Sequence, residues 1–294
     1  MDFKGTLGAL CLPNPARAPR SATPAAARGP APIPDRTTWY APPYQMFDNL
    51  YWVGTKIHSS WALKTSDGII LIDTLYNYAA EPEIIEGLKK LGLDPASIKY
   101  IILTHGHGDH DQGVRLLQDR YHSHVVVSAQ DWDLMENGPD MPGGKPFRDM
   151  VGTDGEKITL GDTSVTLVFT PGHTLGTFSL LFPVKDHGKT VVVAYSGGTL
   201  TGNFGADASK YDTYIASQKK FADAAAKAGA TVVMSNHSEF DGAYTKARLV
   251  ATRQPGEPHP YDVGAGGVQR YFKVMEECTE AMKEKAIKPS GARS

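Results

Sequence analysis

The sequence predicts an α+β fold in which two similar halves pack sheet to sheet. Two observations lead to this expectation. Short apolar runs with the period of two that is typical of strands are followed by a helical pattern, and the same succession returns in the second half of the chain. The 294 residues are 41% hydrophobic and 21% charged, which suits a globular protein with a sizeable core.

The first half is expected to begin near Thr37 or Trp39 with three strands separated by turn signals. A helix over 81–91 follows, because its isoleucines and leucines share one face and Gly92 can end it. The elements expected here are strands 49–55, 59–65, 68–74, 98–104 and 124–129, helices 81–91 and 110–120, and a Gly/Pro-rich loop over 137–150.

The second half repeats the pattern of strands followed by helices. Its strands are apolar enough to be buried, and its helices carry apolar residues on one face. The elements expected here are strands 156–160, 163–170, 177–183, 189–196 and 230–236, and helices 211–228, 241–250 and 268–286.

One domain is expected over 37–250, with a segment on either side. Residues 1–36 are rich in Pro, Ala and Arg and predict a disordered tail, or an atypical export signal with a short apolar part. Residues 251–294 predict an extension whose helix packs on the same domain, with a dimer contact as the alternative. Localisation stays open: periplasmic or secreted with an export signal, otherwise cytoplasmic.

Charge and cysteine content exclude several classes of protein. The net charge of −2 offers no basic field for phosphates, so nucleic acid is not an expected partner. No apolar run reaches the roughly 20 residues that a membrane span needs. Cys11 and Cys278 lie far apart and predict neither a disulfide framework nor a thiolate zinc site. Whether the chain is a monomer or a dimer stays open.

The stretch "THGHGDH", residues 104–110, gathers ligand-type side chains directly after a buried strand. His105 and His107 point to one side if the backbone stays extended, because side chains alternate along a strand. Asp109 and His110 follow, and the glycines between these residues allow tight bends. Neutral imidazoles and a carboxylate in this arrangement predict a pair of zinc ions.

Two further histidines also follow predicted strands. His173 lies in "FTPGHTLG" and His237 in "VVMSNHSEFDG", and loops at strand ends can converge on one edge of a sandwich. We expect both to be metal ligands. The remaining histidines lack such a context and are expected to be ordinary core or surface residues: His58, His122, His124, His187 and His259.

With these motifs the chain resembles the metallo-β-lactamase superfamily. "HGHGDH" matches its H-x-H-x-D-H motif, "GHT" its next histidine motif, and "IILIDT" the strand that ends near the metals. The resemblance implies an αββα four-layer sandwich with a dinuclear zinc site along one edge of the sheets. It implies the following ligands: His105, His107 and His173 on one zinc, and Asp109, His110 and His237 on the other.

Two departures from the family pattern bear on the substrate. Gly198 stands where many family hydrolases carry a bridging aspartate, and the ligand set contains no cysteine. This combination is similar to the third subclass of class B β-lactamases. Gly108 is the second departure, since those enzymes usually carry a larger residue there.

The expected function is that of a two-zinc hydrolase that opens a cyclic amide, as a β-lactamase does. A lactone or another carboxylic ester is the alternative substrate. Two zinc ions lower the pKa of a shared water from about 15.7 towards 7, which provides an attacking hydroxide. Asp109 is expected both to bind metal and to orient the hydroxide or relay its proton. The other expected site residues are Asp73 as a hydrogen-bond acceptor for a ligand loop, and Thr199, Thr201 and Asn203 as substrate contacts.

The residues disfavour two other functions. A flavodiiron-type oxidoreductase shares the fold but needs a glutamate where His107 stands. A non-catalytic binding protein would have no use for a full set of six ligands. The loop over 137–150, Trp39 and Tyr40 could each cover the site or simply face solvent.

Overall fold

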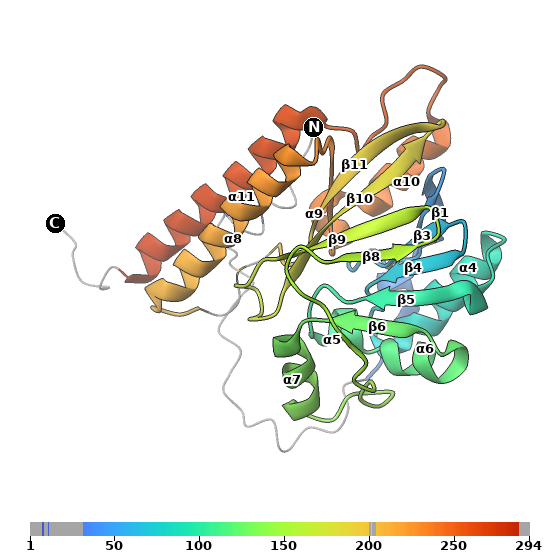
Figure 1. The fold of residues 1–294 in the computed structure, drawn as a ribbon, viewed down its shortest axis with the longest axis horizontal. Helices are drawn as coiled ribbons and strands as arrows, with labels where there is room; N and C mark the ends of the chain where they lie inside the picture. The colour runs from blue at the N-terminus through green and yellow to red at the C-terminus, as the bar shows by residue number, and fades with distance from the viewer. Residues whose placement is uncertain (1–7, 9–10, 12–31, 200, 202–203, 288–294) are drawn as a thin grey trace.

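The structure, a computed structural model, describes residues 8, 11, 32–199, 201 and 204–287. Two β-sheets lie face to face, and helices cover the outer face of each sheet (Figure 1). The predicted αββα four-layer sandwich is therefore confirmed.

The first sheet contains the strands of the N-terminal half in sequence order. Its first four strands pair antiparallel, and the pairs from β4 to β7 are parallel. Its strands are β1 (Tyr44–Phe47), β2 (Leu50–Trp52), β3 (Trp61–Thr65), β4 (Gly68–Ile72), β5 (Ile98–Ile102), β6 (His124–Val127) and β7 (Met150–Val151).

The second sheet has the order β12-β11-β10-β9-β8. β11 and β12 are parallel, and the other neighbours are antiparallel. Its strands are β8 (Lys157–Leu160), β9 (Thr163–Phe169), β10 (Phe178–Asp186), β11 (Lys189–Ser196) and β12 (Val232–Ser235).

The helices divide between the two outer faces. Figure 1 shows α4, α5, α6 and α7 beside the first sheet, and α8 and α11 side by side on the second. The described helices are α2 (Arg36–Trp39), α3 (Asn77–Ala79), the π-helical η2 (Ala80–Ile85), α4 (Glu86–Lys90), the 3₁₀ turn η3 (Pro95–Ser97), α5 (Gly108–Asp111), α6 (Val114–Tyr121), α7 (Ala129–Asn137), α8 (Ala208–Lys227), α9 (Ser238–Asp241), α10 (Ala243–Thr252) and α11 (Gly264–Ile287).

Alternation along the strands builds three apolar layers. Trp61 and Leu63 of β3 point between the sheets, whereas Ala62 between them faces the helices of the first half. In β11, Tyr195 points between the sheets and Ala194 faces α8 and α11. Each fully buried large side chain contributes about 1.5–3 kcal/mol of hydrophobic free energy, so these layers hold the four-layer arrangement together.

The predicted helix over 81–91 begins earlier, at Asn77, and widens to a π-helix over Ala80–Ile85. Pro82 explains this local change, because it has no N–H to donate to the carbonyl four residues before it. Strand β1 and helix α7 were missed by the sequence analysis. In α7 only Trp132 and Met135 are large and buried, which is too short a pattern to stand out.

The C-terminal helix α11 packs on α8 and on the second sheet through Val268, Tyr271 and Phe272. The sequence analysis expected neither a disulfide framework nor a thiolate zinc site, but the structure pairs Cys11 with Cys278 in a disulfide. Both sulfurs pack against the layer beneath α11, which explains how residues so distant in sequence meet. Apart from residues 8, 11 and 32–36, the predicted tail and export signal lie outside the described residues. None of the described helices has the length and apolarity needed to cross a bilayer.

Candidate metal centre

The ligand-type side chains lie where several strands end at one edge of the sandwich. β4 and β5 run parallel and end at Ile72 and Ile102, directly before Asp73 and the histidine loop. In the second sheet, β12 ends at Ser235, two residues before His237. The sheet order therefore brings loops from distant parts of the sequence to one place, as the sequence analysis expected.

His105, His107 and His173 form the first group. One ring nitrogen of each lies within 4.8 Å of the others, and His107 Nδ1 is 3.1 Å from His173 Nε2. His105 Nδ1 lies 3.0 Å from the carbonyl oxygen of Gly197, so this nitrogen carries the proton and donates. The other nitrogen, His105 Nε2, is buried and has no hydrogen-bond partner among the described residues. A lone pair held in this way suits a metal ion.

The second group surrounds the carboxylate of Asp109. Its Oδ2 lies 3.3 Å from His110 Nε2, 3.4 Å from His237 Nε2 and 3.5 Å from His58 Nε2. His58, Asp109 and His237 have ligand atoms within 4.8 Å of one another. The sequence analysis expected His58 to be an ordinary residue, whereas the structure places its ring beside the ligand-type side chains of this group.

His58 reaches the site because of strand register rather than a sequence motif. Trp61 of β3 pairs with Ile72 of β4, so the turn before β3 lies at the same edge as Asp73. The backbone of His58 then forms an isolated bridge with His237. Only the pairing of β3 with β4 could have revealed this residue, because no ligand-type neighbour surrounds it in the sequence.

Comparisons with known proteins agree with this geometry. A model of the metallo-β-lactamase superfamily matches residues 53–187. The crystal structure of BJP-1, a subclass B3 metallo-β-lactamase of Bradyrhizobium japonicum, superposes with a TM-score of 0.69 and 29% identity, covering 84% of this chain and 96% of that one. The chain belongs to the metallo-β-lactamase superfamily.

Curated members of the superfamily match over shorter lengths. Metallo-beta-lactamase domain-containing protein 1 of Xenopus laevis is 33% identical over 129 residues, which is 42% of this chain and 48% of that protein. The N-acyl homoserine lactonase AttM of Rhizobium radiobacter is 28% identical over 180 residues, 55% of this chain and 67% of that protein. The chain thus spans about half the length of the first relative.

Asp73 supports the loop of residues 104–110, which carries four of the ligand-type side chains, at both of its ends. It is fully buried, and it accepts hydrogen bonds from the Thr104 backbone N–H at 2.8 Å and from the Thr104 hydroxyl. His110 Nδ1 lies 3.1 Å from its other oxygen, so His110 presents Nε2 to the site. Burial disfavours charge on His110, yet Asp109 and Asp73 raise its pKa to about 10. A cation bound at Nε2 would replace the proton held there.

His58 and His105 present the opposite case. Burial lowers the pKa of His58 to about 3 and that of His105 well below its usual range. Both imidazoles are therefore neutral, which is the form that binds a metal ion.

Asp131 of α7 was missed by the sequence analysis and supports the first group. Its Oδ2 accepts from the Gly106 N–H at 2.9 Å and from the Thr174 hydroxyl at 2.7 Å. Its Oδ1 accepts from the Gly176 N–H at 3.1 Å. One buried carboxylate thus ties the His105–His107 loop to the His173 loop.

The two family departures have different structural reasons. A Cβ on Gly198 would lie 2.6 Å from the Cβ of His173, so a side chain there would displace a ligand. A Cβ on Gly108 would meet chiefly the amide end of Gln112, which can move aside. Gly198 is thus required by this site, whereas Gly108 is not.

The predicted substrate residues are placed as follows. Thr199 is buried, and its hydroxyl lies 3.2 Å from the Ser196 hydroxyl and 2.6 Å from that of Ser235. Thr201 is also buried. Asn203 lies outside the described residues. The Thr199 hydroxyl therefore already forms hydrogen bonds within the protein.

Aromatic rings connect the N-terminal segment to the second group. Trp39 packs on Tyr78, Tyr78 stacks on Tyr76, and Tyr76 meets His58 edge to face, with ring centroids 5.3, 5.4 and 5.2 Å apart. Tyr40 accepts a hydrogen bond from Lys90. Trp39 thus takes part in a wall beside the site, through two intervening tyrosines.

A small cavity of about 230 Å³ adjoins the first group. It is lined by His173, Leu175, Phe204, Lys210 and Thr213, among others, and offers an apolar wall with one cationic side chain.

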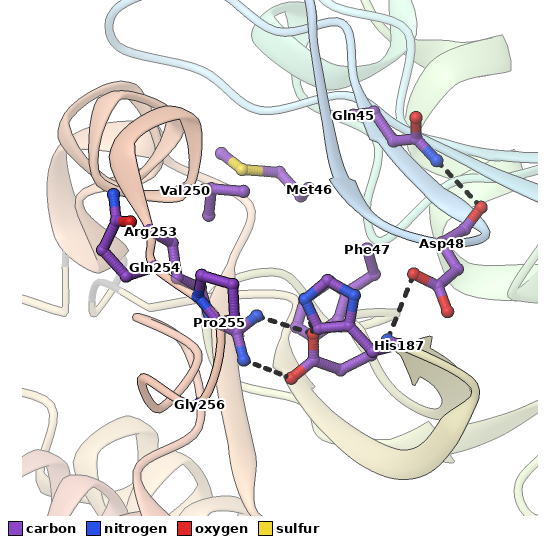
Figure 2. A pocket seen from close by; sticks show the side chains of 11 residues that line it. Gln45, Met46, Phe47, Asp48, His187, Val250, Arg253, Gln254, Pro255 and Gly256 are labelled. Atoms are coloured by element: carbon purple, nitrogen blue, oxygen red, sulfur yellow. Dashed lines mark hydrogen bonds and ion pairs between the residues drawn. The ribbon is translucent and has the colours of Figure 1, made fainter.

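Another cavity, of about 690 Å³, lies elsewhere (Figure 2). It adjoins Asp186, where β10 ends, and therefore belongs to the opposite edge of the second sheet. Its charged groups are already paired, since Arg253 contacts Asp186 at 2.6 and 2.8 Å and Asp48 accepts from the His187 N–H. It has no part in the metal centre.

Proposed function

We propose that the protein is a hydrolase that uses two zinc ions to open a cyclic amide, as a β-lactamase does. The observation that carries this proposal is the juxtaposition of the His105–His107–His173 group with the Asp109-centred group in a fold similar to subclass B3 enzymes. The donor set supports zinc, because imidazole and carboxylate are its common ligands besides thiolate.

Zinc ions held there would supply water of lowered pKa and would stabilise the negative charge that develops on an attacked carbonyl. His105, His107 and His173 would hold the first ion, and Asp109, His110 and His237 the second. The protein's own side chains would orient the attacking water and exclude other water from the site.

Asp109 is proposed to orient the attacking water and to relay its proton. Burial alone would raise the pKa of Asp109, but the surrounding imidazoles, His110 foremost, lower it below the usual range. The carboxylate therefore stays ionised and can accept a hydrogen bond from water throughout the neutral range. The proton passes on to the departing nitrogen or oxygen.

The cavity beside His173 supports a small substrate with an apolar body and a carboxylate. Phe204 and Leu175 offer apolar surface, and Lys210 offers a positive charge whose nearest carboxylate, on Asp207, is 3.8 Å away. We propose that Lys210 binds the substrate carboxylate, together with the predicted contacts from Thr201 and Asn203.

A lactone is the second candidate substrate. The match to an N-acyl homoserine lactonase over 55% of this chain favours it, and the same metal chemistry serves an ester. The pocket, rather than the ions, would decide between the two.

A substrate panel on zinc-loaded protein tests the proposal. We expect kcat/KM on a carbapenem or a chromogenic cephalosporin to exceed that on each of several lactones, and chelation to abolish both activities. Negligible β-lactam turnover with clear lactone turnover would reverse the order of the two substrates. Lys210→Ala should raise KM for carboxylate-bearing substrates up to about fivefold, since exposed charge pairs contribute at most about 1 kcal/mol. Lys227→Ala at the far end of α8 is the matched control.

A further inference from the structure

His58 occupies a position that the six-ligand scheme does not use. Its Nε2 lies 3.5 Å from Asp109 Oδ2, which exceeds the usual length of a direct hydrogen bond. The ring is mostly buried, in edge-to-face contact with Tyr76 and with His237.

The distances within this cluster match the spacing of ligands around one ion. Two ligand atoms that each lie about 2.0–2.1 Å from a tetrahedral zinc stand about 3.3–3.4 Å apart. Three imidazole nitrogens lie 3.3, 3.4 and 3.5 Å from Asp109 Oδ2, on His110, His237 and His58 respectively. His110 Nε2 and His237 Nε2 are themselves 3.3 Å apart. His58 fits this spacing in its distance to Asp109, and its ligand atom also lies within 4.8 Å of that of His237.

The backbone fixes His58 in this place. Its N–H donates to the Thr55 hydroxyl at 2.8 Å, and its carbonyl accepts from the Thr55 N–H at 2.7 Å. The next residue, Ser59, donates to the carbonyl of Asn236 at 2.9 Å, and its hydroxyl contacts that of Ser238. The turn that carries His58 is thus bonded on both sides of His237, so the two rings are held together.

We infer that His58 is a fourth protein ligand of the second ion, which is then held by His58, Asp109, His110 and His237. The inference rests on the proposed function in that both require a two-ion site. It makes the two ions unequal. The second ion would have four protein ligands, whereas three imidazoles would hold the first.

Because the two ions would have different numbers of protein ligands, they would contribute differently to the reaction. Substrate would bind beside the first group, in the cavity that His173 lines. A metal ion held among His58, Asp109, His110 and His237 would supply positive charge next to it. Loss of His58 would open a position on the second ion and weaken its binding.

Stepwise zinc affinities of His58→Ala and His58→Phe test the inference, with His124→Ala as control because His124 is an exposed histidine of the same chain. His58→Phe keeps a ring against Tyr76 without a ligand nitrogen. We expect both His58 variants to bind the second ion at least about tenfold more weakly, since even residues that only support ligands cost 10–100-fold. The affinity for the first ion should stay unchanged, which also shows that the variants are folded.

Cobalt substitution provides a second readout. The visible spectrum of the two-cobalt protein should change in both His58 variants and not in His124→Ala. Unchanged second-ion affinity and an unchanged cobalt spectrum in His58→Phe would overturn the inference. Wild-type protein that binds two ions, loses the second in the His58 variants and hydrolyses neither β-lactam nor lactone would overturn the proposed function and leave His58 assigned as a ligand.

Discussion

Replacing Asp131 with asparagine should weaken the binding of the first metal ion and leave the second unchanged. Asp131 is 1% exposed and accepts three hydrogen bonds, from Gly106, Thr174 and Gly176. Gly106 and Thr174 adjoin ligands of the first group in the sequence, and Gly176 belongs to the same loop as His173. The substitution should therefore lower the affinity for the first metal ion and not that for the second.

The magnitude follows from the number of acceptors that are lost. An asparagine amide keeps one oxygen and turns an NH₂ towards at least one of the three donors, most simply the Gly176 N–H. A buried donor left without a partner costs about 1–3 kcal/mol. At 1.4 kcal/mol per factor of ten, this corresponds to roughly 5- to 150-fold in affinity if the strain falls on the loops. Residues that orient metal ligands typically show losses of about 10–100-fold, which agrees.

Competition with a chromophoric chelator measures both zinc affinities in one titration. Asp133→Asn is the matched control, because Asp133 lies on the same helix, and its exposed carboxylate pairs with Arg148, which also pairs with Glu136. An Asp131→Asn protein that keeps its first-ion affinity, or that loses the second ion instead, would refute the reasoning.

Two further substitutions test the packing and electrostatics around the site. Glu83 is fully buried, and burial raises its pKa to about 8 from an ordinary value near 4.5. The stability of the folded state that protonated Glu83 allows is thus fully present below pH about 4.5 and is lost as pH rises towards about 8. Across that pH range the free energy of unfolding in urea of Glu83→Gln should rise relative to that of wild type, by up to about 5 kcal/mol. A difference that does not depend on pH would contradict this prediction. Gly198→Ala should lower the affinity for the first metal ion about tenfold or more, because the added Cβ would press on His173. Gly266→Ala on α11 is the control and should leave this affinity unchanged. Equal affinities in the two variants would show that a Cβ fits at Gly198.

Much of the fold could be predicted from the sequence, because its strands carry clear apolar patterns. The runs around Ile70, Ile101 and Val193 alternate or stay apolar long enough to be recognised, and all three lie in strands. Strand β1 and helix α7 could not be predicted, since each is short and buries few large side chains.

The same contrast holds for the site. His105, His107, Asp109 and His110 lie within six residues, so local spacing alone indicates a shared task. His58 and Asp131 lie in segments without such a pattern and meet the others only through strand register and helix packing. The disulfide between Cys11 and Cys278 has the same origin, because only the packing of α11 brings the two cysteines together.

The most direct test of the two-ion account is anomalous diffraction at the zinc absorption edge from crystals of the zinc-loaded protein. We expect two peaks roughly 3.5–4 Å apart. One should lie among His105, His107 and His173, and the other should lie against Asp109 Oδ2. A single peak, or peaks away from these side chains, would contradict the account.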